Sequence, residues 1–361
     1  MNISIVTTDS SKAAVRQALA SNPRSQIHGT PEYLRFLHRA VGGVPHEVVA
    51  VHPDGRVLGA SAWFRAEGQS GTIINSLPWH GSHGGCALVA GLDDQLASKV
   101  RRALLQNYLT AISAPEVLAA TMVLPTSEQS ALSDYEEVLN PVARDSRIGQ
   151  VSPLPPPGPN LAVQLEALYQ QKTRNLVRKS LRQGFREYVG DDDWAWRYLH
   201  ETHVNNMLAI GAKPKPWDHL VAIREIMPPD MRRLSVALDG QTPVAAMLLL
   251  LWNQTVEYLV PATTPEHRSR QPLSHLIWHA MNAVVEAGYR MWNWGGTGLG
   301  LTSLHHFKAG FGAVDHPYAY LINVSPRGRE AIIADLAGLV AEFPYYFVFP
   351  LAQVDTLRRV S

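Results

Sequence analysis

A proline-rich segment, PLPPPGPN at residues 153–160, limits the folds open to this chain more than any other feature. Proline cannot continue a helix and cannot sit inside a β-sheet, so such a run separates folded regions. The chain has 361 residues, which exceeds the ~250–300 residues at which a single hydrophobic core stops growing. The sequence therefore predicts two domains, residues 1–152 and 153–361, with the junction at 153–160.

Two segments share one plan, in which a strand, an Asp-Gly turn and a second strand follow one another. They occupy residues 46–64 and 232–262. Asp-Gly between two β-rich runs is a strong hairpin signal. Because helices separate these hairpins, we expect an α+β fold with mixed, mostly antiparallel sheets, and the repeated plan suggests two structural repeats. The expected elements include long helices over 161–186 and 272–287 and a strand in the aromatic tail YYFVF at 345–349.

The composition excludes several classes of protein. A net charge of +1 argues against generic nucleic-acid binding, which needs a broadly basic surface. With Cys86 as the sole cysteine, no intramolecular disulfide or multi-cysteine zinc site can form. The amino terminus lacks a signal-peptide pattern, and the longest apolar run, VAAMLLLLW at 244–252, is too short to cross a bilayer. We therefore expect a cytoplasmic protein without a membrane span.

A basic segment, QKTRNLVRKSLRQGFRE at 171–187, places Arg174, Arg178 and Arg182 four residues apart. This spacing puts the guanidinium groups on one helix face, and the sequence has no acidic residue between 172 and 186 to neutralise them. Such a face either lies in water or binds an anion such as phosphate. We predict contact with phosphate or RNA, with a solvated face as the alternative.

A loop rich in glycine, SLPWHGSHGG at 76–85, contains Trp79, His80 and His83. Glycine lets other groups approach the backbone closely, so this loop is a candidate substrate-binding segment. A sharp turn between strands is the alternative. A second candidate is the pair Arg268 and Arg270, which precede a helix whose free amides attract anions. The Gly-x-Gly pattern that wraps the pyrophosphate of coenzyme A is absent there.

Histidine pairs do not predict a metal site in this chain. HETH at 200–203 is not the HExxH zinc motif, and no third ligand follows at a suitable spacing. We expect no metal and no tightly bound cofactor. A single histidine can still act as a base, and His203, which shares its helix with Glu201, Asn205 and Asn206, is our candidate.

The segment WNWGGTGLGLTSLHHFKAGFGA at 292–313 combines glycines, aromatic residues and one lysine, Lys308. A lysine in an apolar setting is a positive charge with little competition from water. Lys308 is therefore a candidate for stabilising an oxyanion or a donor phosphate. We also expect Trp294, Gly295, Gly296 and Thr297 to line a substrate site.

Taken together, these segments resemble the FemABX-like branch of the GNAT-related acyltransferases, whose peptidoglycan members move an amino acid from aminoacyl-tRNA to a precursor amine. The resemblance rests on SLPWHGSHGG, TRNLVRKSLRQGF, EHRSRQPLSHLIWHAM with GYRMWNWGGT, and FKAGFGA, in the family's order. It implies two tandem GNAT-like domains and equates Lys308 with the family's functional lysine. The chain departs from the family in lacking an inserted helical arm, and Trp292-Asn293-Trp294 replaces the usual acidic residue before the glycines.

These features predict an enzyme that forms an amide on the amino group of a small polar or precursor acceptor. Aminoacyl-tRNA is the expected donor, because the arginine face suits phosphate and the coenzyme A pattern is missing. One alternative is a GNAT-type N-acetyltransferase that uses acetyl-CoA or another acyl-CoA on an amino sugar or metabolite. A second alternative is a non-catalytic ligand-binding protein. The amine is deprotonated by His203 or by a substrate phosphate.

Overall fold

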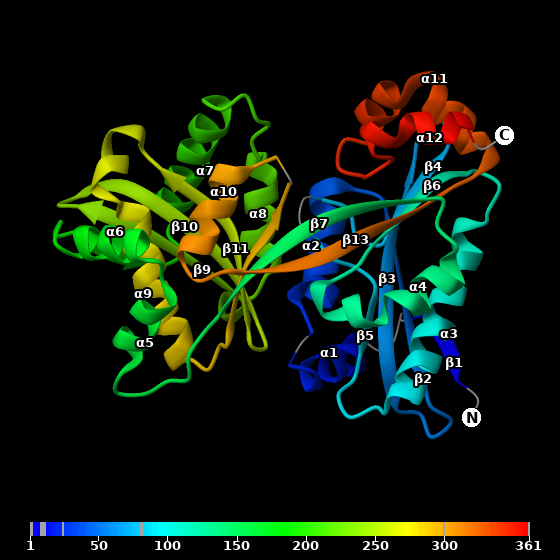
Figure 1. The fold of residues 1–361 in the computed structure, drawn as a ribbon, viewed down its shortest axis with the longest axis horizontal. Helices are drawn as coiled ribbons and strands as arrows, with labels where there is room; N and C mark the ends of the chain where they lie inside the picture. Colours follow the sequence, from blue (N-terminus) through cyan, green and yellow to red (C-terminus); the bar gives the residue numbers. More distant parts are fainter. Residues whose placement is uncertain (1–2, 8–11, 24, 80–81, 299, 360–361) are drawn as a thin grey trace. The chain divides into compact units, whose positions relative to one another are not determined.

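The computed structural model describes residues 3–7, 12–23, 25–79, 82–298 and 300–359. The chain forms two compact units (Figure 1). The first unit contains residues 1–147 together with 317–361, and the second contains residues 148–316. Among the described residues, no helix is long and apolar enough to cross a membrane.

The first unit is a mixed sheet with helices. Its strands follow the order β1-β2-β3-β4-β6-β13, and β5 pairs with β3. Neighbouring strands are antiparallel except for β4 and β6, which are parallel. The elements are β1 (Ser4–Thr7), α1 (Lys12–Ser21), α2 (Pro31–Val41), β2 (Val44–Val51), β3 (Val57–Glu67), β4 (Thr72–Asn75), β5 (Cys86–Leu88), α3 (Asp94–Ile112), β6 (Val117–Val123), α4 (Leu132–Leu139), β13 (Val314–Val324), α11 (Pro326–Glu342) and α12 (Val354–Arg359).

Local sequence signals explain the helix starts in the first unit. The hydroxyl of Thr30 accepts a hydrogen bond from the amide of Tyr33, and Pro31 occupies the first position of α2, which is the usual pattern of a capped helix start. Asp93 caps α3 in the same way through the amide of Leu96. The apolar face of α3 then packs on β2, β3 and β5 and closes the core of this unit.

The second unit follows the same plan, with the strand order β7-β12-β11-β10-β9-β8. The pair β11 and β12 is parallel, and the other neighbours are antiparallel. The elements are β7 (Ala143–Pro153), α5 (Leu161–Leu168), α6 (Gln171–Leu181), β8 (Arg186–Val189), α7 (Asp193–Leu208), α8 (Trp217–Ile226), β9 (Arg232–Asp239), β10 (Thr242–Trp252), β11 (Thr255–Thr263), α9 (Pro272–Glu286), β12 (Met291–Thr297) and α10 (Thr302–Gly310).

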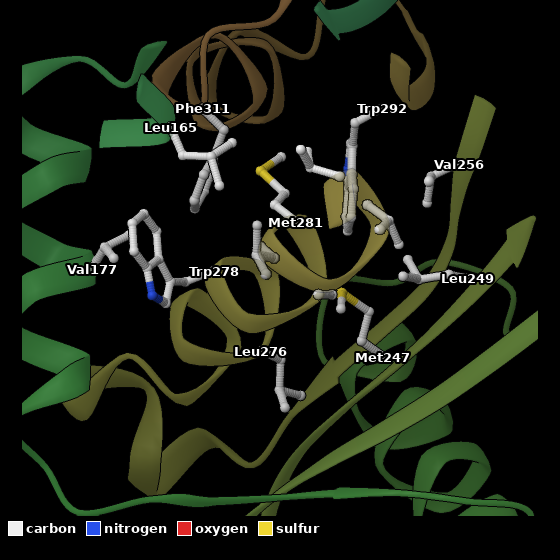
Figure 2. Close-up of a cluster of buried hydrophobic side chains, with 14 of the residues drawn as sticks. Leu165, Val177, Met247, Leu249, Val256, Leu276, Trp278, Met281, Trp292 and Phe311 are labelled. Carbon is white, nitrogen blue, oxygen red and sulfur yellow. The ribbon is translucent and has the colours of Figure 1, made fainter. Parts of the chain in front are cut away.

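The core of the second unit lies between its sheet and the helices α5, α6 and α9. Figure 2 shows this cluster, in which Met281 of α9 and Trp292 of β12 pack among apolar side chains of the strands. Trp292 and Met281 are fully buried. Because α7 contributes no residue to this cluster yet contacts β10 and β11, it covers the opposite face of the sheet.

Three expectations about elements differ from the structure. The helix predicted over 161–186 is two helices, α5 and α6, followed by strand β8. The tail at 345–349 forms no strand, because the side chain of Asn75 takes both backbone groups of Phe347, at 2.7 and 2.9 Å. The carboxyl-terminal residues 317–361 belong to the first unit, since β13 pairs with β6. The sequence groups them with the second domain, and a division into two independently folding domains stays a prediction.

Candidate functional site

Strands β11 and β12 separate in the middle of the second unit's sheet. They pair only from Thr255 to Glu257 and from Met291 to Asn293, although β11 continues to Thr263 and β12 to Thr297. A register shift in β11 falls between its pairs at Tyr258 and Val260, so the strand bulges at Leu259, two residues after Glu257. The other edge of β12 pairs with β7 both before and after this point, from Met291 to Thr297. Beyond Glu257, the edge of β11 that faced β12 has no strand partner among the described residues.

Glu257 lies at the last paired position before the strands separate. Its neighbours Val256 and Tyr258 pack in the core on the α9 side, so the carboxyl group points to the opposite face of the sheet. The residue is 7% exposed, and its Oε1 atom is buried without a hydrogen-bond partner. Burial raises the pKa of Glu257 to about 7, and a hydrogen bond from Asn293 offsets only part of that effect. The carboxyl group can therefore take up or release a proton near neutral pH.

Lys308, on α10, is buried beside the same part of β12. Its ammonium group donates to the carbonyl oxygens of Gly295 and Gly296 at 3.2 and 3.1 Å and to the hydroxyl of Thr297 at 2.8 Å. A lysine ammonium has three N–H donors, so these contacts use all of them. Burial lowers the pKa of Lys308 to about 8. The side chain thus holds the end of β12 in place, and contact with a substrate oxygen requires that one of these bonds is released.

The end of β12 connects Glu257 with Lys308 through hydrogen bonds. Asn293 bonds to Glu257, and its Oδ1 atom accepts from the amide of Gly295. Gly295 has a φ of 72°, a left-handed conformation that favours glycine. Its carbonyl then accepts from Lys308. A carboxyl group that titrates near neutrality and a buried cation are therefore linked across one short strand end.

Residues 170–308, which include all of these groups, match the family model of an acetyltransferase (GNAT) domain. The chain contains a GNAT-type acyltransferase domain. A comparison with curated protein sequences finds no match. This match confirms the predicted resemblance to GNAT-related acyltransferases and the predicted enzyme class, an acyltransferase.

Solved structures resemble the whole chain in fold. FemX has a TM-score of 0.70 at 13% identity, covering 89% of this chain and 97% of FemX. A tandem GNAT protein from the clavulanic acid biosynthesis pathway has a TM-score of 0.53 at 11% identity, covering 90% and 98%. The C-terminal domain of a putative lysylphosphatidylglycerol synthetase from Agrobacterium fabrum has a TM-score of 0.53 at 12% identity, covering 94% and 99%. The predicted α+β fold with tandem GNAT-like halves is confirmed.

Other predicted residues of the GNAT domain have mainly structural contacts. Trp294 is 3% exposed and donates from its indole nitrogen to Ser152, 2.8 Å away. Thr297 is buried and bonds Gln150 as well as Lys308. Gly296 is exposed. The structure thus brings Gly295, Gly296 and Thr297 to Lys308, while Trp294 lies in the core beneath them.

His203 does not have a free lone pair in this structure. Its Nε2 atom accepts a hydrogen bond from the amide of Lys215 at 3.1 Å, so in the neutral ring the proton is on Nδ1. Nδ1 is buried without a partner. Burial and, to a smaller degree, the charge of Lys215 lower the pKa of His203 to about 4. The geometry favours Glu257 over His203 as the base.

The arginines of the basic segment do not form one continuous helical stripe. Arg174 and Arg178 lie on α6, whereas Arg182 follows the last residue of the helix. Arg178 pairs with Glu166 of α5 at 2.5 Å, because the turn between the two helices brings them together. Arg174 is half-buried and Arg182 is exposed. Of the three arginines predicted to share one face, Arg174 and Arg182 therefore have no ion pair among the described residues, whereas Arg178 has one.

The two arginines before α9 differ in their contacts. Arg268 is exposed. Arg270 pairs with Asp239, bonds the side chain of Gln183 at 2.9 Å and lies over the ring of Phe185. These contacts occupy its guanidinium group, so Arg268 is the one that is available to a ligand.

The glycine-rich loop of the first unit is largely internal. Trp79 is 5% exposed and packs edge-on against Phe36. His83 is also buried and lies against the ring of Tyr318. A Cβ atom on Gly84 would meet Ser76, so this glycine serves close packing within the unit. His80 lies outside the described residues.

Glu257 is a candidate functional residue that the sequence analysis missed. A signal was present, because Glu257 is the only charged residue between Thr242 and Thr263. A single glutamate in a strongly apolar stretch is either at a solvated position or buried at an energetic cost. Strand alternation alone does not separate these cases, since both faces of this sheet are covered by helices.

Proposed function

We propose that this GNAT-type enzyme forms an amide by transferring an aminoacyl group from aminoacyl-tRNA to the amine of a small polar acceptor. The acceptor nitrogen attacks the ester carbonyl, the new C–N bond forms, and the ester C–O bond to the ribose breaks. The ribose hydroxyl receives a proton as it leaves, and the amine loses one. A charged tRNA as donor implies a reaction in the cytoplasm.

The observation that carries this proposal is Glu257 at the separation of β11 and β12. An amine attacks only after losing its proton, and an efficient base has a pKa near the working pH. The pKa of about 7 for Glu257 meets that condition. The unpaired edge of β11 beyond Glu257 supports the assignment, because backbone amides there can hydrogen-bond an extended acyl donor.

The start of α9 supports tRNA over coenzyme A as the donor. A pyrophosphate binds well where several free backbone amides of a first helical turn converge. Here the first position is Pro272, which has no N–H, and the amide of His275 already bonds Gln271. The guanidinium group of Arg270 is already paired with Asp239. The start of α9 therefore offers few hydrogen-bond donors to a pyrophosphate. Exposed Arg182 and half-buried Arg174 suit the phosphates of a larger nucleic acid.

Transfer of an acetyl group from acetyl-CoA is the second candidate. It is favoured by the match of residues 170–308 to an acetyltransferase domain model. Thermal unfolding in the presence of each donor tests the two candidates. Charged tRNA at about 100 times its Kd should stabilise the protein by ~2.7 kcal/mol, and acetyl-CoA should leave the unfolding temperature unchanged. Stabilisation by acetyl-CoA alone would reject the tRNA donor, and uncharged tRNA measures the contribution of the nucleic acid by itself.

Removing the partner of Arg178 should strengthen the ionic part of tRNA binding. In Glu166→Gln the guanidinium group of Arg178 loses its carboxylate and becomes available to a phosphate. The slope of log K against log salt concentration should become more negative by roughly 0.7–0.9, the value for one additional phosphate contact. The measurement is tRNA affinity at several salt concentrations, with exposed Glu201→Gln as the control. An unchanged slope would show that α6 does not touch the tRNA.

A further inference from the structure

The first unit contains a cavity of about 400 Å³ that the acyl-transfer site of the GNAT domain does not use. This volume lies within the range of small-molecule sites. Its walls come from α1, β2, β3, β5 and α3. Many of the side chains that line the cavity are apolar, including Val15, Leu19, Leu34, Val48, Leu77 and Leu92.

Two buried histidines lie at the polar part of this cavity. The Oε1 atom of Gln26 lies 3.1 Å from Nδ1 of His83 and 3.4 Å from Nδ1 of His28. A carbonyl oxygen only accepts hydrogen bonds, so both Nδ1 atoms carry the proton and both Nε2 atoms are acceptors. His28 and His83 are 5% and 4% exposed.

Neither acceptor nitrogen has a hydrogen-bond donor among the described residues. The Nε2 atom of His83 is completely covered and unpaired. His28 lines the cavity, and its one hydrogen bond among the described residues uses Nδ1, so we assign its Nε2 atom as the acceptor for a molecule in the cavity. A buried acceptor without a donor costs free energy, and a ligand that supplies an O–H group removes that cost.

The charges around the cavity disfavour an anion. Arg101 is the one arginine or lysine of the described lining, and it already pairs with Glu128 and Asp134 at 2.7 Å each. Burial lowers the pKa of both histidines, that of His83 to about 4, so neither is cationic at neutral pH. Burial also raises the pKa of Cys86 to about 12, which keeps its thiol neutral. A phosphate or carboxylate would therefore find no uncommitted positive charge.

We infer that this cavity binds an uncharged small molecule with an apolar body and a hydroxyl group that donates to Nε2 of His28. The apolar body lies among the side chains of α1, β2 and β5, and the hydroxyl replaces the missing donor. This site lies in the first unit, and it does not depend on the donor or acceptor of the acyl-transfer reaction.

Three matched pairs of probes test this inference: cyclohexanol and methoxycyclohexane, 4-ethylphenol and 4-ethylanisole, and 1-hexanol and 1-methoxyhexane. Each ether keeps the oxygen and the apolar body but lacks the hydroxyl donor. We expect at least one alcohol to bind at millimolar concentration in calorimetry, about tenfold more tightly than its ether. Methyl NMR signals of Leu19 and Leu34 should shift, since both side chains line the cavity.

Variants locate the binding and the hydrogen bond. His28→Leu should weaken the alcohol about tenfold and remove the difference from the ether. Exposed His316→Leu carries the same change in the second unit and should have no effect. Ala62→Phe places a ring in the cavity and should abolish binding, provided that its unfolding temperature shows a folded protein. The inference is overturned if no alcohol binds, if alcohol and ether bind equally, or if folded Ala62→Phe binds like the wild type.

Discussion

Glu257→Gln should lower the turnover number, kcat, by about 10²–10⁴-fold, the usual contribution of a positioned general base. Glutamine keeps the shape of glutamate and can still bond Asn293, so the strands should keep their positions. It cannot accept a proton from the amine. The loss should therefore fall on kcat more than on KM, and steady-state kinetics at saturating donor measures it.

The role of Glu257 as a base also predicts the direction in which the reaction rate changes with pH. Glu257 is protonated below its pKa of about 7 and becomes a base above it. The wild-type rate should therefore rise as the pH passes through about 7 and then level off, whereas Glu257→Gln should show no such step. Glu286→Gln, an exposed change at the end of α9, is the matched control. A variant at position 257 with full activity and an unchanged pH profile would place the base elsewhere.

The reaction rate should rise with pH, whereas the free energy of unfolding should fall. The pKa of Glu257 is higher in the folded chain than its ordinary value of 4.5, so the folded state binds more protons between pH 4.5 and about 7. The unfolding free energy of the wild type, relative to Glu257→Gln, should therefore fall by roughly 2–4 kcal/mol as the pH rises through this range. Denaturant unfolding at several pH values measures this difference without any substrate.

Local signals in the sequence predict much of the fold. Thr30 followed by Pro31 gives the start of α2, and the two Asp-Gly turns give the hairpins of both units, because these features act through their nearest neighbours. Contacts between distant segments are different. The sequence does not show that β13 returns to β6, or that Asn75 holds Phe347, since these bonds join residues about 200 or more positions apart.

In the candidate site, too, local sequence signals are predictable and contacts between separate elements are not. Lys308 stands out in the sequence by its apolar, aromatic setting, and the structure confirms that it is buried. Its three acceptors depend on how α10 folds back onto β12, which spacing alone does not specify. In the same way, the absence of acidic residues between 172 and 186 does not predict that Glu166 neutralises Arg178, because that contact depends on a turn between α5 and α6.

Lys308→Met should lower kcat by about 10²-fold, the loss expected when reacting groups are displaced by ~1 Å. Methionine fills a similar volume but makes none of the three hydrogen bonds, so Gly295, Gly296 and Thr297 lose their anchor. Asn293 bonds both Gly295 and Glu257, which carries the displacement to the base. Exposed Lys99→Met is the control. Unchanged turnover would make Lys308 a packing residue only.

Unfolding measurements separate the two contributions of Lys308 to stability. At pH 7, losing its bonds should cost the variant about 1–3 kcal/mol for each acceptor left unsatisfied, less the relief from no longer burying a charge. The charge contribution has its own pH window. Because the pKa of Lys308 is about 8 in the folded chain and 10.5 ordinarily, the unfolded chain binds more protons between these values. The stability of the wild type relative to Lys308→Met should therefore rise from pH 8 to 10.5. If the difference in unfolding free energy between the wild type and Lys308→Met stayed constant over this range, the hydrogen bonds to Gly295, Gly296 and Thr297 would fully offset the cost of burying the ammonium group. Lys308 would then stay protonated, and positively charged, throughout this range.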